Sequence, residues 1–296
     1  MSAAVALQPG VPLALAHAAY VAPRLAARVQ GLGEQAPSDL SFANLWLFRR
    51  IHDYRLLEAD WPVIRGRTYD GQSHWLPLFS LADAPVQVLR DLLAGGECFY
   101  PVAQCEVARL DPQYFIVDSQ RDDADYLYDA DTFRHYRGPR LHNKRNLLKQ
   151  CLANHRLHVQ PYTPELQEVA LQILNAWLQD KGKQSGDADD LPCREALALA
   201  PQLGLQGFLA WADGEPAGFV LAEELQPGVF VMRFAKGLAR FKGISQAMFQ
   251  HFAAHVGPPA RWINFEQDMG LPNFRRTKMS YQPQALLLKC RVRWKD

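Results

Sequence analysis

The densest group of side chains suited to catalysis lies between Glu266 and Tyr281, at the end of a short apolar segment. The carboxylates of Glu266 and Asp268 could accept a proton from an amine, which acyl transfer to nitrogen requires. Arg275 and Lys278 could hold an anionic group of a donor or acceptor. Tyr281 could protonate a leaving group. Because so much charge beside a buried strand is costly unless it is paired or used, this segment is predicted to form a site.

For Asp268 taken alone, a structural role is the preferred interpretation. Its carboxylate could cap the N-terminus of a short following helix and neutralise the cations nearby. The prediction of a site therefore depends on the whole segment rather than on this one residue.

A second candidate site lies between Lys236 and Ser245, where a strand is expected to give way to a helix. Backbone N–H groups exposed at a helix start, together with the helix dipole, attract a phosphate or carboxylate. Gly243 suits the turn, and Lys236, Arg240 and Lys242 add positive charge. The spacing resembles the pyrophosphate loop of GNAT-type N-acetyltransferases, with Ser245 in place of the last small residue. A glycine-containing loop with solvated charges is the competing interpretation.

A third cluster is the basic segment from Gly138 to Lys149, which includes Lys144, Arg145 and Asn146. Leucines supply an apolar face, so the segment is predicted to form an amphipathic helix. Such a helix could bind the anionic part of a phospholipid, a nucleotide-linked donor or an RNA. It could equally be a solvated face, neutralised by the acidic segment before it. No aromatic residue follows Gly138 within the segment, so stacking of single-stranded RNA bases is not expected.

The overall charge hides this pattern. The 296 residues include 32 Lys and Arg and 31 Asp and Glu, giving a formal net charge of +1. With 48% hydrophobic residues the chain is predicted to be globular rather than disordered. Residues 111–131 contain seven acids and one arginine, whereas residues 132–164 contain seven basic residues and no acid. Near-neutrality is therefore no argument against an anionic partner.

Strands and helices are expected to alternate around these clusters. In the last third, strands are predicted at Gly207–Ala212, Ala217–Glu224 and Val229–Ala235, followed by a helix at Ile244–Val256 and a strand at Trp262–Phe265. Antiparallel strands followed by a helix and a further strand suggest an α/β acyltransferase core. The earlier predicted elements are a hairpin around residues 69–72, helices at 85–94, 134–154 with an interruption at Gly138-Pro139, 164–180 and 191–200, and a loop at 181–190.

Cofactor and compartment signals are negative. The five cysteines are odd in number and contain no CxxC pair, so we expect neither a disulfide framework nor a structural zinc site. No histidine spacing typical of a metal site occurs. The N-terminal residues lack a basic start, and no apolar stretch is long enough to span a membrane. A cytoplasmic protein without metal or tightly bound cofactor is therefore expected.

Several segments together resemble a known family. They are Leu40–Leu45, Tyr126–Asp129, Leu141–Asn146, Phe241–Ile244 and Phe265–Gly270 with Arg275, Lys278 and Tyr281. They are similar to the bacterial family of unknown function related to the C-terminal domain of phosphatidylglycerol lysyltransferases, over roughly residues 40–283.

The resemblance implies an α/β fold with mixed sheets and two tandem acyl-CoA N-acyltransferase-like domains, as in Fem-type transferases. The expected domains are residues 1–157 and residues 158–296, with the main site in the second. The resemblance also implies an aminoacyl-tRNA or acyl-CoA as donor substrate.

Three functions follow from these observations. The first is an acyl- or aminoacyltransferase that moves a group from an anionic donor to an amine or hydroxyl. The second is a non-catalytic module on the same fold that binds RNA or an anionic lipid, with peripheral but no integral membrane contact. The third and weaker one is a structural partner protein. The carboxylates at Glu266 and Asp268 favour the first, because a pure anion binder gains nothing from acids in its cleft.

Overall fold

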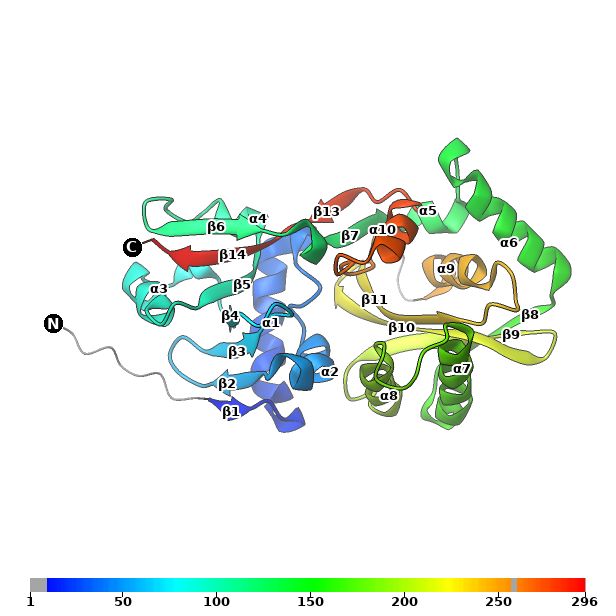
Figure 1. Ribbon diagram of the computed structural model, residues 1–296, viewed down its shortest axis with the longest axis horizontal. Coiled ribbons are helices and arrows are strands. Elements are labelled where there is room, and N and C mark those ends of the chain that lie inside the picture. The colour runs from blue at the N-terminus through cyan, green and yellow to red at the C-terminus, as the bar shows by residue number, and fades with distance from the viewer. Residues whose placement is uncertain (1–9, 257–259, 296) are drawn as a thin grey trace. The chain divides into compact units, whose positions relative to one another are not determined.

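The computed structural model describes residues 10–256 and 260–295 (Figure 1). These residues form two compact units. Unit 1 comprises the described residues up to Asp125 together with those from Leu287 onward, and unit 2 runs from Tyr126 to Leu286.

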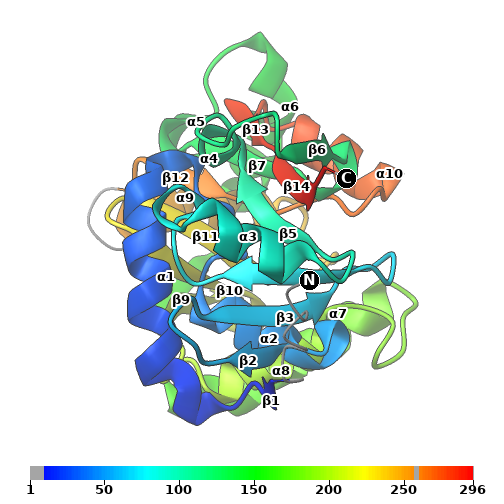
Figure 2. The ribbon, with the colours of Figure 1, turned by 90° about the vertical axis from the view of Figure 1, so that its left-hand side faces the viewer.

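Unit 1 is built on a seven-stranded sheet in the order β1-β2-β3-β4-β5-β14-β6. The strands are β1 (Val11–Pro12), β2 (Arg55–Leu57), β3 (Val63–Arg67), β4 (Ser73–Pro77), β5 (Cys98–Ala103), β14 (Lys289–Trp294) and β6 (Phe115–Ser119). The helices are α1 (Ala18–Leu32), α2 (Phe42–His52), α3 (Val86–Leu93) and α4 (Gln104–Val107). Helix α1 crosses the strands, as Figures 1 and 2 show. Its Arg28 donates hydrogen bonds to the carbonyl oxygens of Pro77 and Pro101, which end β4 and lie in β5.

The core of unit 1 forms because α3 has leucines at helical spacing. Leu89, Leu92 and Leu93 are buried against Trp75 of β4 and Phe99 of β5. The hairpin predicted around residues 69–72 is confirmed, because β3 and β4 pair antiparallel across it.

Unit 2 is built on a second seven-stranded sheet, in the order β13-β7-β12-β11-β10-β9-β8. The strands are β7 (Asp125–Asp129), β8 (Leu157–Pro161), β9 (Leu205–Ala212), β10 (Glu215–Gln226), β11 (Val229–Gly237), β12 (Trp262–Asn264) and β13 (Ala285–Leu287). The helices are α5 (Ala130–His135), α6 (His142–Asn154), α7 (Gln167–Asp180), α8 (Asp190–Ala198), α9 (Ile244–His255) and α10 (Pro272–Met279). Helices α7 and α9 pack on opposite faces of β10 and β11 (Figure 1).

The elements predicted in the last third of the chain are confirmed, with small shifts of their ends. The predicted basic helix at 134–154 is interrupted, as expected. Tyr136 and Gly138 have positive φ angles of 46° and 88°, and Pro139 starts a new helical turn. These conformations separate α5 from α6, because an α-helix requires negative φ at every position.

The two sheets have the same topology. Each sheet also contains one strand from the other half of the sequence. In unit 1, β4 pairs in parallel with β5, and β14 lies antiparallel between β5 and β6. In unit 2, β11 pairs in parallel with β12, and β7 lies between β12 and β13. The C-terminal strand thus completes the first sheet, and a strand from the first half of the chain completes the second.

This exchange explains why the predicted division after residue 157 and the compact units do not coincide. Strand β7 and helices α5 and α6 precede residue 157 but belong to unit 2, whereas β14 belongs to unit 1. The units are set by hydrogen bonding between strands distant in sequence. Local periodicity, which identifies a strand, carries no information on its partner.

Candidate functional site

Two of the predicted clusters follow the carboxyl ends of the parallel strands β11 and β12 of the unit 2 sheet. Val229–Val231 of β11 pair with Trp262–Asn264 of β12, where β12 ends, and β11 continues to Gly237. Glu266 and Asp268 follow β12, while Gly243 follows β11 and begins α9. Carboxyl ends of parallel strands are where α/β folds form their binding sites.

Glu266 is held by a buried arginine just beyond the last paired residues. Its backbone has a positive φ of 57°, and its Oε1 accepts a hydrogen bond from Nη1 of Arg233 at 2.5 Å. Arg233 also donates to Glu223 of β10, at 2.7 and 3.0 Å. Burial acts to lower the pKa of Arg233, but the two carboxylates raise it above its usual value. The Glu266 side chain is 21% exposed, so a fixed cation orients a carboxylate that solvent still reaches.

Asp268, in contrast, is fully buried and surrounded by donors. Its oxygens accept hydrogen bonds from the hydroxyl of Tyr126 at 2.5 Å, from Arg275 at 2.9 and 3.1 Å, and from the backbone N–H of Gly270 at 2.9 Å. Burial alone would raise the pKa of Asp268, but these hydrogen bonds lower it well below its usual value. A carboxylate stabilised in this way is a weak proton acceptor, and the geometry favours a structural role.

That structural role is not the predicted helix cap. Helix α10 has Leu271 at its N-cap position and no side-chain cap, with Pro272 at the first helical position. Asp268 instead closes the turn ahead of α10, by accepting from Gly270 and fixing Arg275.

Lys278 points back at the same turn. Its ammonium donates to the carbonyl oxygens of Phe265 and Gln267, both at 2.6 Å, and of Glu266 at 3.3 Å. By donating to three carbonyl oxygens, Lys278 fixes the backbone around Glu266. In this structure the lysine therefore positions the residues that follow β12.

Tyr281 joins the basic helix to α9. Its buried hydroxyl accepts a hydrogen bond from Nε2 of Gln246 at 2.5 Å, and burial raises the pKa of Tyr281 to about 12. The ammonium of Lys144, on α6, lies 4.0 Å from the centre of the Tyr281 ring. Burial lowers the pKa of this half-buried lysine. Two residues predicted from separate clusters are thus in direct contact.

The neighbours of Lys144 on α6 bind within their own segment. Arg145 donates to the carbonyl oxygens of Tyr136 at 2.6 Å and Gly138 at 3.3 Å, and Asn146 lies 2.8 Å from the ring of His142. Arg145 thereby fixes the break between α5 and α6.

Two cations of the Gly243 turn, Lys236 and Arg240, have carboxylate partners within the chain. Lys236 is 4% exposed, forms an ion pair with Asp189 at 2.6 Å and lies 4.0 Å from the centre of the Trp177 ring. The exposed Arg240 pairs with Glu215 at 2.9 Å. An anionic ligand at this turn would therefore take the place of protein carboxylates.

Gly243 is required by close packing as well as by backbone conformation. Its φ is 88°, and an added Cβ would overlap the carbonyl oxygen of Leu147 on α6. Ser245, half-buried, follows in the first turn of α9. The start of α9 is thus packed against the basic helix.

Replacing Gly243 with alanine is expected to lower the free energy of unfolding by about 1–3 kcal/mol or more, because backbone strain and a steric clash add. Gly214→Ala is the matched control, since its φ is 85° but an added Cβ would meet nothing within 4 Å. Urea denaturation of both variants measures the difference. Equal decreases in the free energy of unfolding for the two variants would show that the close contact between Gly243 and Leu147 of α6 does not affect stability.

Sequence reasoning missed the residues that hold the predicted ones. These are Tyr126, Asp189, Glu223, Arg233 and Gln246. Arg233 gave one usable signal, because a charged residue stands inside an otherwise apolar strand. Tyr126 enters the sequence analysis only within the segment Tyr126–Asp129 that resembles the family. For Asp189, Glu223 and Gln246 the pairing itself becomes visible only in the folded chain.

Within residues 10–256 and 260–295, no group of three or more His, Cys, Asp or Glu side chains could hold a metal ion. Over the same residues, every helix is too short or too polar to cross a membrane.

Comparison with known proteins gives a family and a fold. The family model described as phosphatidylglycerol lysyltransferase, C-terminal, matches residues 31–289. No curated protein matches the sequence.

Three solved structures resemble the chain over nearly its whole length. A conserved protein of unknown function from Bacteroides thetaiotaomicron VPI-5482 has a TM-score of 0.82 at 22% identity, covering 97% of this chain and 99% of that one. L-PGS from Bacillus licheniformis has a TM-score of 0.59 at 14% identity, with 97% and 94% covered. FemX has a TM-score of 0.60 at 7% identity, with 96% of each chain covered. The two mixed sheets and their helices match the tandem GNAT and FemX-like fold, so the predicted fold class is confirmed.

Proposed function

The chain belongs to the phosphatidylglycerol lysyltransferase C-terminal family, and from that membership we propose that it is a transferase of acyl or aminoacyl groups. The donor would be anionic, either an aminoacyl-tRNA or an acyl-CoA, and the acceptor an amine or a hydroxyl. The observation that carries the proposal is the Glu266 carboxylate, which is solvent-accessible and oriented by Arg233 at the carboxyl end of β12.

In the proposed reaction, the acceptor nitrogen or oxygen attacks the carbonyl carbon of the donor ester or thioester. A C–N or C–O bond forms, and the bond to the ribose oxygen or the thiol sulfur breaks. Glu266 takes the proton that the acceptor loses. Tyr281 supplies a proton to the departing atom; its hydroxyl accepts from Gln246, which leaves its own hydrogen to donate.

Charge around these residues suits an anionic donor. The Gly243–Ser245 turn, with Lys236 and Arg240, would hold the donor phosphates in place of Asp189 and Glu215. Lys144, Arg145 and Asn146 would line the same approach through α6. Asp268, Arg275 and Lys278 would keep the Glu266 turn in place.

The test combines detection of a bound donor with a transfer assay. Native mass spectrometry of the purified protein looks for co-purified coenzyme A or tRNA, and labelled acetyl-CoA or lysyl-tRNA is then incubated with an amine acceptor. Transfer of label to the acceptor from either donor is expected. Binding of tRNA that weakens steeply with salt, without transfer from any donor, would overturn the proposal in favour of a non-catalytic anion-binding module.

A further inference from the structure

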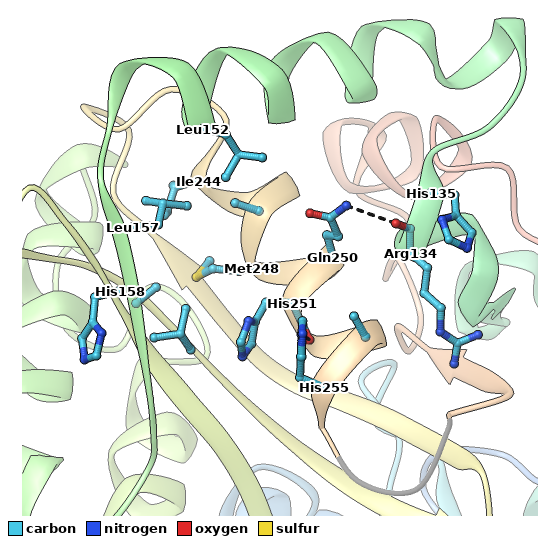
Figure 3. Close-up of a pocket in the computed structure, with 14 residues that line it drawn as sticks. Arg134, His135, Leu152, Leu157, His158, Ile244, Met248, Gln250, His251 and His255 are labelled. Atoms are coloured by element: carbon cyan, nitrogen blue, oxygen red, sulfur yellow. Dashed lines mark hydrogen bonds between the residues drawn. The ribbon is translucent and has the colours of Figure 1, made fainter.

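A groove of about 670 Å³ lies beside α9 in unit 2 (Figure 3). It is formed by one face of α9, by β8 and β9, and by Leu152 of α6, with α5 at one end. Its volume lies within the range of about 300–1,000 Å³ typical of small-molecule sites. Neither of the proposed catalytic residues, Glu266 and Tyr281, lines it. Its lining is largely apolar and includes Leu152, Leu157, Val159, Ile244 and Met248.

Imidazole rings border this aliphatic surface. His251 and His255 stand one turn apart on α9 and stack with ring centroids 4.5 Å apart. His158 of β8 and His135 of α5 also line the groove. Nδ1 of His255 lies 3.2 Å from the carbonyl oxygen of His251, so a neutral His255 ring that donates there keeps Nε2 as its other polar atom. A negative charge close to the stacked pair would favour the protonated form of a ring.

The groove supplies no such negative charge itself. All of its charged or titratable lining groups in the described chain are Arg134 and the four histidines. Arg134 is engaged, because it donates to the carbonyl oxygen of Ala253 at 2.8 Å and pairs with Asp131 at 2.7 Å. At the turn between β9 and β10, Asp213 is paired with His155 at 2.6 Å. A ligand that complements this surface therefore has an apolar body and an anionic end.

We propose that the groove binds a fatty carboxylate, with its hydrocarbon chain along α9 and β8 and its carboxylate at the His251–His255 pair. A single flexible chain matches the apolar lining, and one carboxylate can accept a hydrogen bond from a protonated ring of the stacked pair. This binding is independent of the proposed transfer reaction.

Binding should depend on pH in a defined direction. Burial, together with the charge of His255, lowers the pKa of His251, so this ring is largely neutral at pH 7. A bound carboxylate favours the protonated ring, so binding takes up a proton and strengthens as the pH falls. Among the described residues, His255, His158, His135 and Arg134 are the other charged or titratable groups that line the site, and Asp131 beside Arg134 is the carboxylate that opposes them.

The experiment is calorimetric titration of the full chain with monomeric dodecanoate and with dodecanol, in the presence of EDTA. Dodecanoate should bind more tightly at about pH 6 than at about pH 8, and dodecanol equally at both. The double variant His251→Gln/His255→Gln should weaken dodecanoate about tenfold and leave dodecanol unchanged. Each methylene added to the chain should strengthen binding about fourfold.

Two tryptophan variants locate the site. Ala254→Trp, at an exposed position in the groove, should abolish binding of both ligands. Leu191→Trp, on α8, is the matched control, since its side chain is 56% exposed and outside the groove, and it should bind as the wild type does. Equal binding of dodecanoate and dodecanol, binding only to phospholipid vesicles, or binding only to a peptide that pairs with the β8 edge would each overturn the proposal.

Discussion

Glu266→Gln is expected to lower the rate of transfer by about 10²–10⁴-fold while the protein stays folded. Glutamine keeps the shape of the side chain and can still accept a hydrogen bond from Arg233, but it cannot take a proton from the acceptor. The loss should fall on kcat, with little change in donor affinity, because the carboxylate acts on the acceptor. Steady-state kinetics with the donor identified in the transfer assay measure both quantities.

Glu223→Gln provides the matched control for this prediction. Glu223 is the other carboxylate on Arg233, and its side chain is 13% exposed against 21% for Glu266. Each variant neutralises one of the two carboxylates that pair with Arg233. Any effect that acts through Arg233 should therefore be similar in the two variants. If the rate falls equally in both, Glu266 is not the proton acceptor and its role is to hold the arginine.

Lys289→Met is expected to lower the free energy of unfolding by about 3–5 kcal/mol, a large share of the 5–15 kcal/mol typical of a domain. The ammonium of Lys289 is fully buried and lies 2.5 Å from Asp39 and 2.7 Å from Asp125. Burial acts to lower the pKa of Lys289, but the two carboxylates raise it above its usual value. Without the lysine, the fully buried Asp125 and the largely buried Asp39 lose their shared counter-ion. Urea denaturation followed by circular dichroism measures the loss.

Two further variants separate charge from other effects at Lys289. Lys295→Met changes an exposed lysine next to the end of the same strand and should alter stability little. Adding Asp39→Asn and Asp125→Asn to Lys289→Met should restore part of the lost stability, since no uncompensated charge then remains buried. A loss for Lys289→Met no greater than that for Lys295→Met would contradict the importance of the buried triad.

This triad also shows how the exchanged strand is secured. Lys289 begins β14, which is the last strand in the sequence, whereas Asp39 and Asp125 lie in the first half of the chain. The ion pairs and the pairing of β14 with β5 and β6 together hold the C-terminal segment in unit 1.

The sequence by itself determined the fold class and most of the local elements. Short apolar runs bounded by turn residues identified β9 to β11, and helical spacing of apolar residues identified α9, because both patterns follow directly from backbone geometry and burial. Gly138 and Pro139 indicated the break in the basic helix for the same local reason. Charge and position also placed Glu266 and Asp268 at a strand end.

The tertiary structure decided which partners these residues have. The sequence favours a structural role for Asp268 taken alone, but only the structure shows that Asp268 is fully buried among Tyr126, Arg275 and Gly270, whereas Glu266 remains accessible beside Arg233. Lys278 looked like an anion ligand but is held by backbone carbonyls. The exchange of β7 and β14 was equally hidden. Some of the deciding partners are distant in sequence, as Tyr126 is from Asp268 and Arg233 from Glu266, and others, such as Arg275, are near. In both situations burial and hydrogen bonding in the folded chain set the chemistry of the group.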